Sequence, residues 1–245
     1  MEHLVITQTS VFPDQIGYRI AKRVMDVALC LLALPFALPI MIICAVAIVV
    51  NSPGPVLFSQ VRIGKGGRRF RMYKLRTMKH GLDDTYHRAF MKAFVRGEIE
   101  TRSKSDSRKA FMRVFIDEPA SGAREDEYIY KPVRPSQVTQ VGRILRKTSA
   151  DELPQIINVL KEEMSWVGPR PNVPWEVEEY QAWHYRRLQV LPGMTGLAQV
   201  RGRSCVSFDD IVRYDIEYLE KQSLIMDIKI LWWTLRSVVD GKGAG

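Results

Sequence analysis

Two adjacent carboxylates, Asp151 and Glu152, are the strongest candidates for chemistry in this sequence. Three basic residues lie just upstream, namely Arg143, Arg146 and Lys147. Their positive charge is expected to keep both carboxylates ionised. One carboxylate can then attack phosphorus as a nucleophile while the other gives or takes a proton. However, Ser149-x-x-Glu152 is also a capping-box pattern, which taken alone explains the pair better than catalysis does.

Two turns and one strand-like segment would place further cations near this pair. Arg170 stands between two prolines, which hold its backbone extended and its guanidinium ready for bidentate phosphate binding. A second, glycine-punctuated stretch over 192–203 ends at Arg203, and Lys74 and Arg76 alternate along a basic segment. Each pattern alone is an ordinary turn or strand. Together they indicate a site for a phosphorylated substrate.

The composition sets limits on the function. The chain has 245 residues, of which 46% are hydrophobic and 26% charged, so a disordered or fibrous protein is excluded. A net charge of +9 favours an anionic partner: nucleic acid, an acidic membrane or a phosphorylated substrate. We expect no nucleic acid, because no nucleic-acid-binding fold pattern is present. The three scattered cysteines and four histidines show neither a disulfide framework nor a zinc site.

An uncharged apolar run over residues 27–50 is long enough for a hydrocarbon core, which needs about 20 residues. It is too long for an ordinary signal peptide. A simple spanning helix would need one flank poor in positive charge, and both flanks are basic. Pro35 and Pro39 predict a break near the middle of the run. The pattern therefore favours a re-entrant helix-break-helix, with both ends on the cytosolic side.

The remaining chain reads as mostly α with a small β-hairpin. Strands are predicted over 56–62 and 70–76, around a turn at 64–67. Helices are predicted over 87–95, 108–115, 149–160, 176–190, 208–222 and 224–239, the first two inside a partly mobile insertion at 80–137. The last is amphipathic and carries Trp232 and Trp233, so it lies either in the membrane interface or in the core. The predicted organisation is a tail (1–17), a membrane segment (18–55) and a membrane-associated catalytic domain (56–245).

A series of motifs extends over about residues 18–243. In chain order these are Lys22-Arg23-x-x-Asp26, Pro53-Gly54-Pro55, Phe58-Ser59-Gln60-Val61-Arg62-Ile63-Gly64, Lys74-Leu75-Arg76-Thr77-Met78, Ser149-Ala150-Asp151-Glu152-Leu153-Pro154, Asn158-Val159-Leu160, 164–171, 192–196, Tyr218 and 227–231. In these motifs the sequence resembles the monotopic bacterial phosphoglycosyl transferases, also called bacterial sugar transferases. That resemblance also implies a re-entrant membrane helix, although Leu38-Pro39 replaces the Ser-Pro pair that breaks it in the family.

The resemblance implies a reaction and a site. A sugar-1-phosphate would pass from a UDP-sugar to undecaprenyl phosphate, releasing UMP, at the cytoplasmic face of the bacterial inner membrane and in contact with its lipids. This is the priming step of exopolysaccharide, capsule or O-antigen synthesis. Asp151 would be the nucleophile and form a phosphosugar-aspartate intermediate, Glu152 its partner, and Arg146, Arg170 and Arg203 the phosphate- and substrate-binding residues. Mg²⁺ is expected at Asp151.

Several points stay open at this stage. The chain length and the His87-containing insertion favour glucose or galactose over an N-acetylated sugar. The 80–137 insertion is expected to help select the sugar or a partner, and association into a homo-oligomer is left undecided. A non-catalytic membrane scaffold of a polysaccharide assembly complex is the alternative function, and the intact Asp151, Glu152, Arg170 and Arg203 argue against it.

Overall fold

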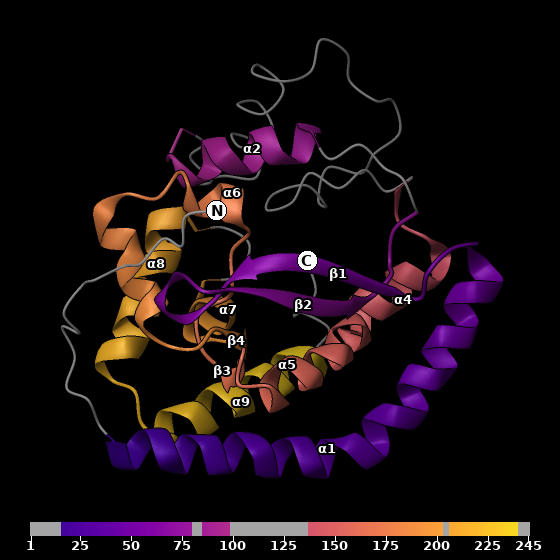
Figure 1. The fold of residues 1–245 in the computed structure, drawn as a ribbon, viewed down its shortest axis with the longest axis horizontal. Coiled ribbons are helices and arrows are strands. Elements are labelled where there is room, and N and C mark those ends of the chain that lie inside the picture. The colour runs from indigo at the N-terminus through magenta and orange to yellow at the C-terminus, as the bar shows by residue number, and fades with distance from the viewer. Residues whose placement is uncertain (1–15, 80–84, 99–136, 203–205, 240–245) are drawn as a thin grey trace.

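A computed structural model describes residues 16–79, 85–98, 137–202 and 206–239 (Figure 1). It confirms a mostly helical chain with a small antiparallel hairpin. The elements are α1 (Ile16–Asn51), β1 (Leu57–Ile63), η1 (Lys65–Gly67), β2 (Arg69–Leu75), α2 (Thr85–Val95), α4 (Gln140–Thr148), η3 (Ala150–Gln155), α5 (Ile156–Leu160), β3 (Ser165–Val167), α6 (Pro174–Val177), η4 (Ala182–Gln189), β4 (Gly193–Thr195), α7 (Leu197–Arg201), α8 (Phe208–Glu220) and α9 (Leu224–Val239), where η marks a 3-10 helix.

Helix α1 is long and apolar enough to cross a membrane. The prediction that the helix is interrupted is wrong, because helical structure continues through Pro35 and Pro39. The helix instead bends: in Figure 1 it runs along the lower edge of the molecule and then turns upward. The two prolines are four residues apart, so both missing N–H groups lie on one helix face, which explains a bend without a break.

Both halves of α1 are fastened to the rest of the molecule. Near its start, Tyr18 and Lys22 donate to the buried Asp227 of α9, at 2.9 and 3.0 Å. Near its end, Ile48 is buried in a cluster with Leu75 of β2 and Leu145 of α4. Helix α1 therefore follows the surface of the domain along its whole length.

The hairpin is as predicted, with β1 and β2 pairing antiparallel from Leu57↔Leu75 to Ile63↔Arg69. One face of β2 packs against α1 and α5, where Phe70 and Met72 are buried with Cys30 and Ile156. A second, parallel pair, β3 and β4, was not predicted. With three residues each, these strands are too short to show an alternating pattern.

Three helix predictions need correction. The helix expected over 149–160 is divided into the 3-10 helix η3, which contains Pro154, and the short α-helix α5. The helix expected over 176–190 is divided into α6 and η4, because apolar residues three apart fit a 3-10 helix as well as an α-helix. Helix α2, expected inside a mobile insertion, packs into a core cluster through Phe90 and Phe94. The helix predicted at 108–115 lies outside the described residues. Helices α8 and α9 are confirmed, and the interfacial position of α9 stays a prediction.

Candidate active site

The carboxylate pair lies on the short 3-10 helix η3, next to the end of β2. The Nζ of Lys74 is 2.6 Å from Oε1 of Glu152 and 4.0 Å from Oδ2 of Asp151. The alternative explanation of the pair as a capping box is not supported, because Ser149 is a left-handed C-cap of α4 and its side chain makes no capping bond at η3. Both carboxylates lie in the first turn of η3, and Glu152 contacts Lys74.

Burial dominates the electrostatics of Asp151, which is only 8% exposed. Desolvation raises the pKa of this carboxyl above its ordinary value, and the nearby charge of Glu152 raises it further. The positive charges of Lys74 and Arg146 act in the opposite direction without cancelling the rise. The basic surroundings predicted from sequence are thus present, but they offset the cost of burial only in part.

A close approach between α4 and the residues after β2 positions Arg146. A Cβ added to Gly142 would lie 2.0 Å from the carbonyl oxygen of Thr77, so only glycine allows this contact. Arg146 Nε then donates to Thr77 Oγ1 at 3.0 Å. In this place its charge acts on Asp151 and lowers the pKa of that carboxyl.

Arg170 lies in a loop that packs against the second glycine-rich turn. Added Cβ atoms on Gly193 and Gly196 would lie 2.1 and 2.3 Å from the Gly168 backbone, which accounts for both glycines. Three consecutive carbonyls of this loop, those of residues 170, 171 and 172, each accept a hydrogen bond. Their donors are Arg187 at 3.1 Å, Arg62 at 3.1 Å and the Ile63 backbone at 2.9 Å.

Arg62 also belongs to the site. It is part of the motif over 58–64 but was not predicted as a site residue. Burial and the charge of Arg170 lower its pKa to about 10, against the attraction of Glu176 and Glu152. It therefore belongs to the same electrostatic cluster as Lys74. The hairpin register places Arg62 opposite Phe70, on the same face as Lys74. The alternation along the two predicted strands could therefore have indicated that Arg62 faces the site.

Two predicted residues are not brought to the carboxylates by the described contacts. Arg76 donates to the backbone carbonyls of Ser52 and Pro53, so it holds the turn that follows α1. Its predicted role in phosphate binding stays a prediction. Arg203 lies outside the described residues, and Pro35 and Pro39 belong to the membrane helix rather than to the site.

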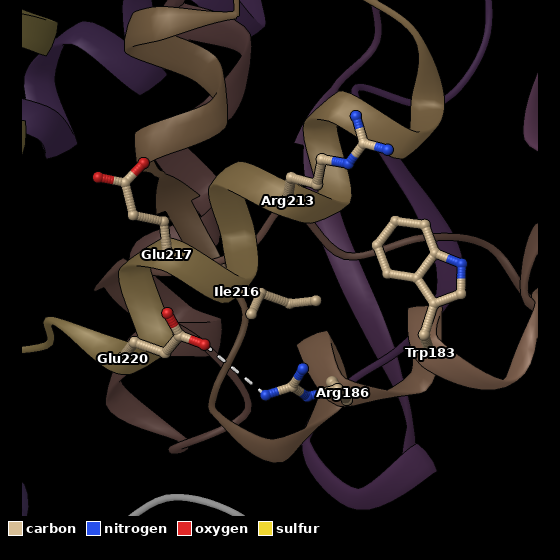
Figure 2. A pocket seen from close by; sticks show the side chains of 6 residues that line it. All are labelled: Trp183, Arg186, Arg213, Ile216, Glu217 and Glu220. Carbon is tan, nitrogen blue, oxygen red and sulfur yellow. Dashed lines mark ion pairs between the residues drawn. The ribbon is translucent and has the colours of Figure 1, made fainter.

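An open hollow of about 400 Å³ lies between η4 and α8 (Figure 2). It is lined by Trp183, Arg186, Arg213, Ile216, Glu217 and Glu220. Arg186 and Glu220 form an ion pair at 3.7 Å across it. None of the predicted catalytic residues lines this hollow, and the charges around it are balanced. Among the described residues, no three His, Cys, Asp or Glu side chains gather as a metal cage.

Comparison with known proteins identifies the family of this chain. Residues 17–241 match the family model described as bacterial sugar transferase. The chain belongs to the bacterial sugar transferase family. The match covers both the membrane helix and the carboxylate site.

Curated relatives of this chain carry different sugar names. It is 35% identical over 92% of its length to the UDP-glucose:undecaprenyl-phosphate glucose-1-phosphate transferase of Caulobacter vibrioides, of which it covers 72%. It is 34% identical over 93% of its length to the galactosyl transferase CpsE of Streptococcus agalactiae, covering 44% of that protein. A third relative, the UDP-N-acetylgalactosamine-undecaprenyl-phosphate N-acetylgalactosaminephosphotransferase of Aeromonas hydrophila, is 33% identical over the whole chain. The chain spans 49% of the Aeromonas relative, about half.

Proposed function

We propose that this protein transfers a sugar-1-phosphate from a UDP-sugar to undecaprenyl phosphate at a membrane surface. One observation carries the proposal: a buried aspartate, Asp151, lies beside Lys74 and Arg146 while its neighbour Glu152 is held by the same lysine. The family match and the names of the Caulobacter and Aeromonas relatives support the substrate classes.

The arrangement suits two successive displacements at one phosphorus atom. A carboxylate oxygen of Asp151 attacks the phosphorus bonded to the sugar, and the bond from that phosphorus to the bridging oxygen breaks with release of UMP. A phosphate oxygen of the lipid then attacks the same phosphorus, and the bond to Asp151 breaks, which restores the carboxylate. Because Lys74 is much closer to Glu152 than to Asp151, the nucleophile is not locked in a short ion pair.

The cations around the pair have separate tasks in this reaction. Arg170 is held on a rigid loop and is well placed to bind a phosphate, as is Arg146 beside Asp151. Glu152, in contact with Lys74, is the group that takes or gives the proton at the acceptor phosphate. These cations offset the repulsion between the carboxylate and the diphosphate and stabilise the negative charge that develops in the transition state.

The residues present fit a magnesium ion. Mg²⁺ is usually bound by one or two carboxylates together with substrate phosphates and water, and the adjacent oxygens of Asp151 and Glu152 offer that donor set. When bound, the ion would neutralise charge between the diphosphate and the nucleophile. Asp151 would hold it, while Lys74 continues to orient Glu152.

The re-entrant topology is part of the proposal. A straight 36-residue helix is about 54 Å long and would carry one end far from the domain. Here Lys22 at one end and Ile48 at the other both contact the domain, which supports entry and exit on one side. Labelling of single cysteines placed before Lys22 and after Pro55 tests it. Accessibility from opposite sides of sealed vesicles would contradict the topology, which the proposal assigns to the cytoplasmic face of the inner membrane.

The decisive assay is UMP release from a panel of UDP-sugars with undecaprenyl phosphate and Mg²⁺. Wild type is expected to release UMP from UDP-glucose or UDP-galactose, and Asp151→Asn is expected to lose the activity. Glu220→Gln, a surface carboxylate of α8, is the matched control and should keep it. Full activity of Asp151→Asn would refute the assigned nucleophile, and no UMP from any sugar with folded wild type would favour a scaffold.

A further inference from the structure

An aromatic side chain is exposed beside the candidate active site. Phe58 of β1 is 49% exposed, although phenylalanine is normally buried. In the hairpin register Phe58 lies directly opposite Lys74. Opposite residues of an antiparallel pair project from the same face, with Cβ atoms about 5 Å apart. The ring therefore lies next to the lysine that holds Glu152.

The end of helix α1, close to this residue in sequence, also carries exposed apolar side chains. Val50, in the last turn of α1, is 81% exposed, whereas Leu57 is exposed on the opposite hairpin face from Phe58. Arg76 binds the carbonyls of Ser52 and Pro53 and so fixes the turn between these two elements. The exposed end of α1 and the exposed ring of Phe58 are thus joined by one short turn, which Arg76 holds.

We propose that Phe58 binds the hydrocarbon chain of the polyprenyl phosphate next to its phosphate. This inference rests on the proposed function and extends it to the acceptor. The lipid has to bring a phosphate to Asp151 while its isoprene units remain at the membrane. Phe58 lies opposite Lys74 and follows the turn at the exposed end of α1, where the first isoprene units would pass. A nucleotide base is the other natural partner of an aromatic ring, but it would not require continuity with the membrane helix.

Separate measurement of the two half-reactions tests this assignment. Without lipid, the enzyme should release one equivalent of UMP as the phosphosugar moves to Asp151, and Phe58→Ala should leave the rate of this burst unchanged. With undecaprenyl phosphate, Phe58→Ala should lower kcat/KM for the lipid about tenfold, equivalent to about 1.4 kcal/mol. Phe58→Leu should recover most of the loss, since an isoprene chain needs an apolar contact rather than a ring.

Val61→Ala is the matched control, because Val61 is 40% exposed on the same strand but lies opposite Arg71 on the other hairpin face. It should behave as wild type in both steps. A slower UMP burst in Phe58→Ala, not rescued by leucine, would assign the ring to the nucleotide and overturn the inference. Unchanged kcat/KM for the lipid would also overturn it. Failure of wild type to release any UMP would instead refute the proposed function on which the inference rests.

Discussion

Substitution of Arg187 by lysine should destabilise the loop that carries Arg170. Arg187 is fully enclosed, and its guanidinium forms an ion pair with Asp215 at 2.6 Å. It also donates to the Arg170 carbonyl, to Asn172 Oδ1 and to the Tyr180 hydroxyl, at 3.1, 2.6 and 3.0 Å. A planar guanidinium can serve these four partners from two nitrogens, whereas the three donors of a lysine ammonium lie on a single atom that cannot reach both sides.

The magnitude follows from the partners left without a donor. Lysine would keep the Asp215 pair at best, leaving at least two buried acceptors unsatisfied at about 1–3 kcal/mol each. We therefore expect Arg187→Lys to lower the free energy of unfolding by about 3 kcal/mol. For a chain of this size, that corresponds to a fall in melting temperature of roughly 6–12 °C. UMP release should fall as well, because the Arg170 carbonyl loses its donor.

The adjacent Arg186 provides the control, since it lies on the same helix, is partly exposed and pairs with Glu220 at 3.7 Å (Figure 2). Arg186→Lys should change the melting temperature by no more than about 2 °C, as is usual for exposed ion pairs. Both variants should be melted in the same detergent, at the same scan rate. If the two variants have the same melting temperature, the guanidinium of Arg187 does not satisfy the buried acceptors, and the reasoning from these contacts is wrong.

Three further perturbations test other parts of the structure. Lys74→Met removes a charge that lowers the pKa of Asp151, so the acidic limb of the pH–rate profile for UMP release should move to higher pH; an unmoved limb would mean that another group controls it. Gly193→Ala would place a Cβ 2.1 Å from the Gly168 backbone and should cost about 1–3 kcal/mol in thermal unfolding, whereas Gly17→Ala meets nothing within 4 Å and should cost nothing. Asp227→Asn should cost about 3–5 kcal/mol and release the start of α1 to protease, because Lys22 loses its buried partner; equal protease resistance to wild type would contradict this anchoring role.

The sequence predicted the elements in which buried and exposed side chains follow one another at a regular spacing. Burial alternates over the first four residues of β2, so Phe70 and Met72 recur every second residue and reveal the strand. Helix α9 is similarly clear because it packs on one side only. The division between α6 and η4 was not predictable, because the buried residues His184 and Arg187 of η4 are three apart, a spacing that α-helices and 3-10 helices share.

The candidate site was predictable as a set of residues but not as a geometry. Sequence placed Asp151 and Glu152 among cations, yet it could not tell that Glu152 takes the short contact with Lys74, because that pair joins segments 78 residues apart. Partners distant in sequence also hid the roles of Arg62 and Arg76, whose carbonyl partners are 109 and 23–24 residues away. Long-range register decides whether a basic residue faces a substrate or a carbonyl, and composition carries no information on it.

One strand couples the candidate active site to the end of α1. Lys74 contacts the carboxylates, and Arg76, two residues further along, binds the turn that follows α1. Two residues of extended chain span about 7 Å, so the carboxylates cannot move far relative to the point where the chain leaves α1. Under the proposed topology this point lies at the membrane surface. The strand would then hold Asp151 at the depth of the lipid phosphate, so that the acceptor need not leave the bilayer to react.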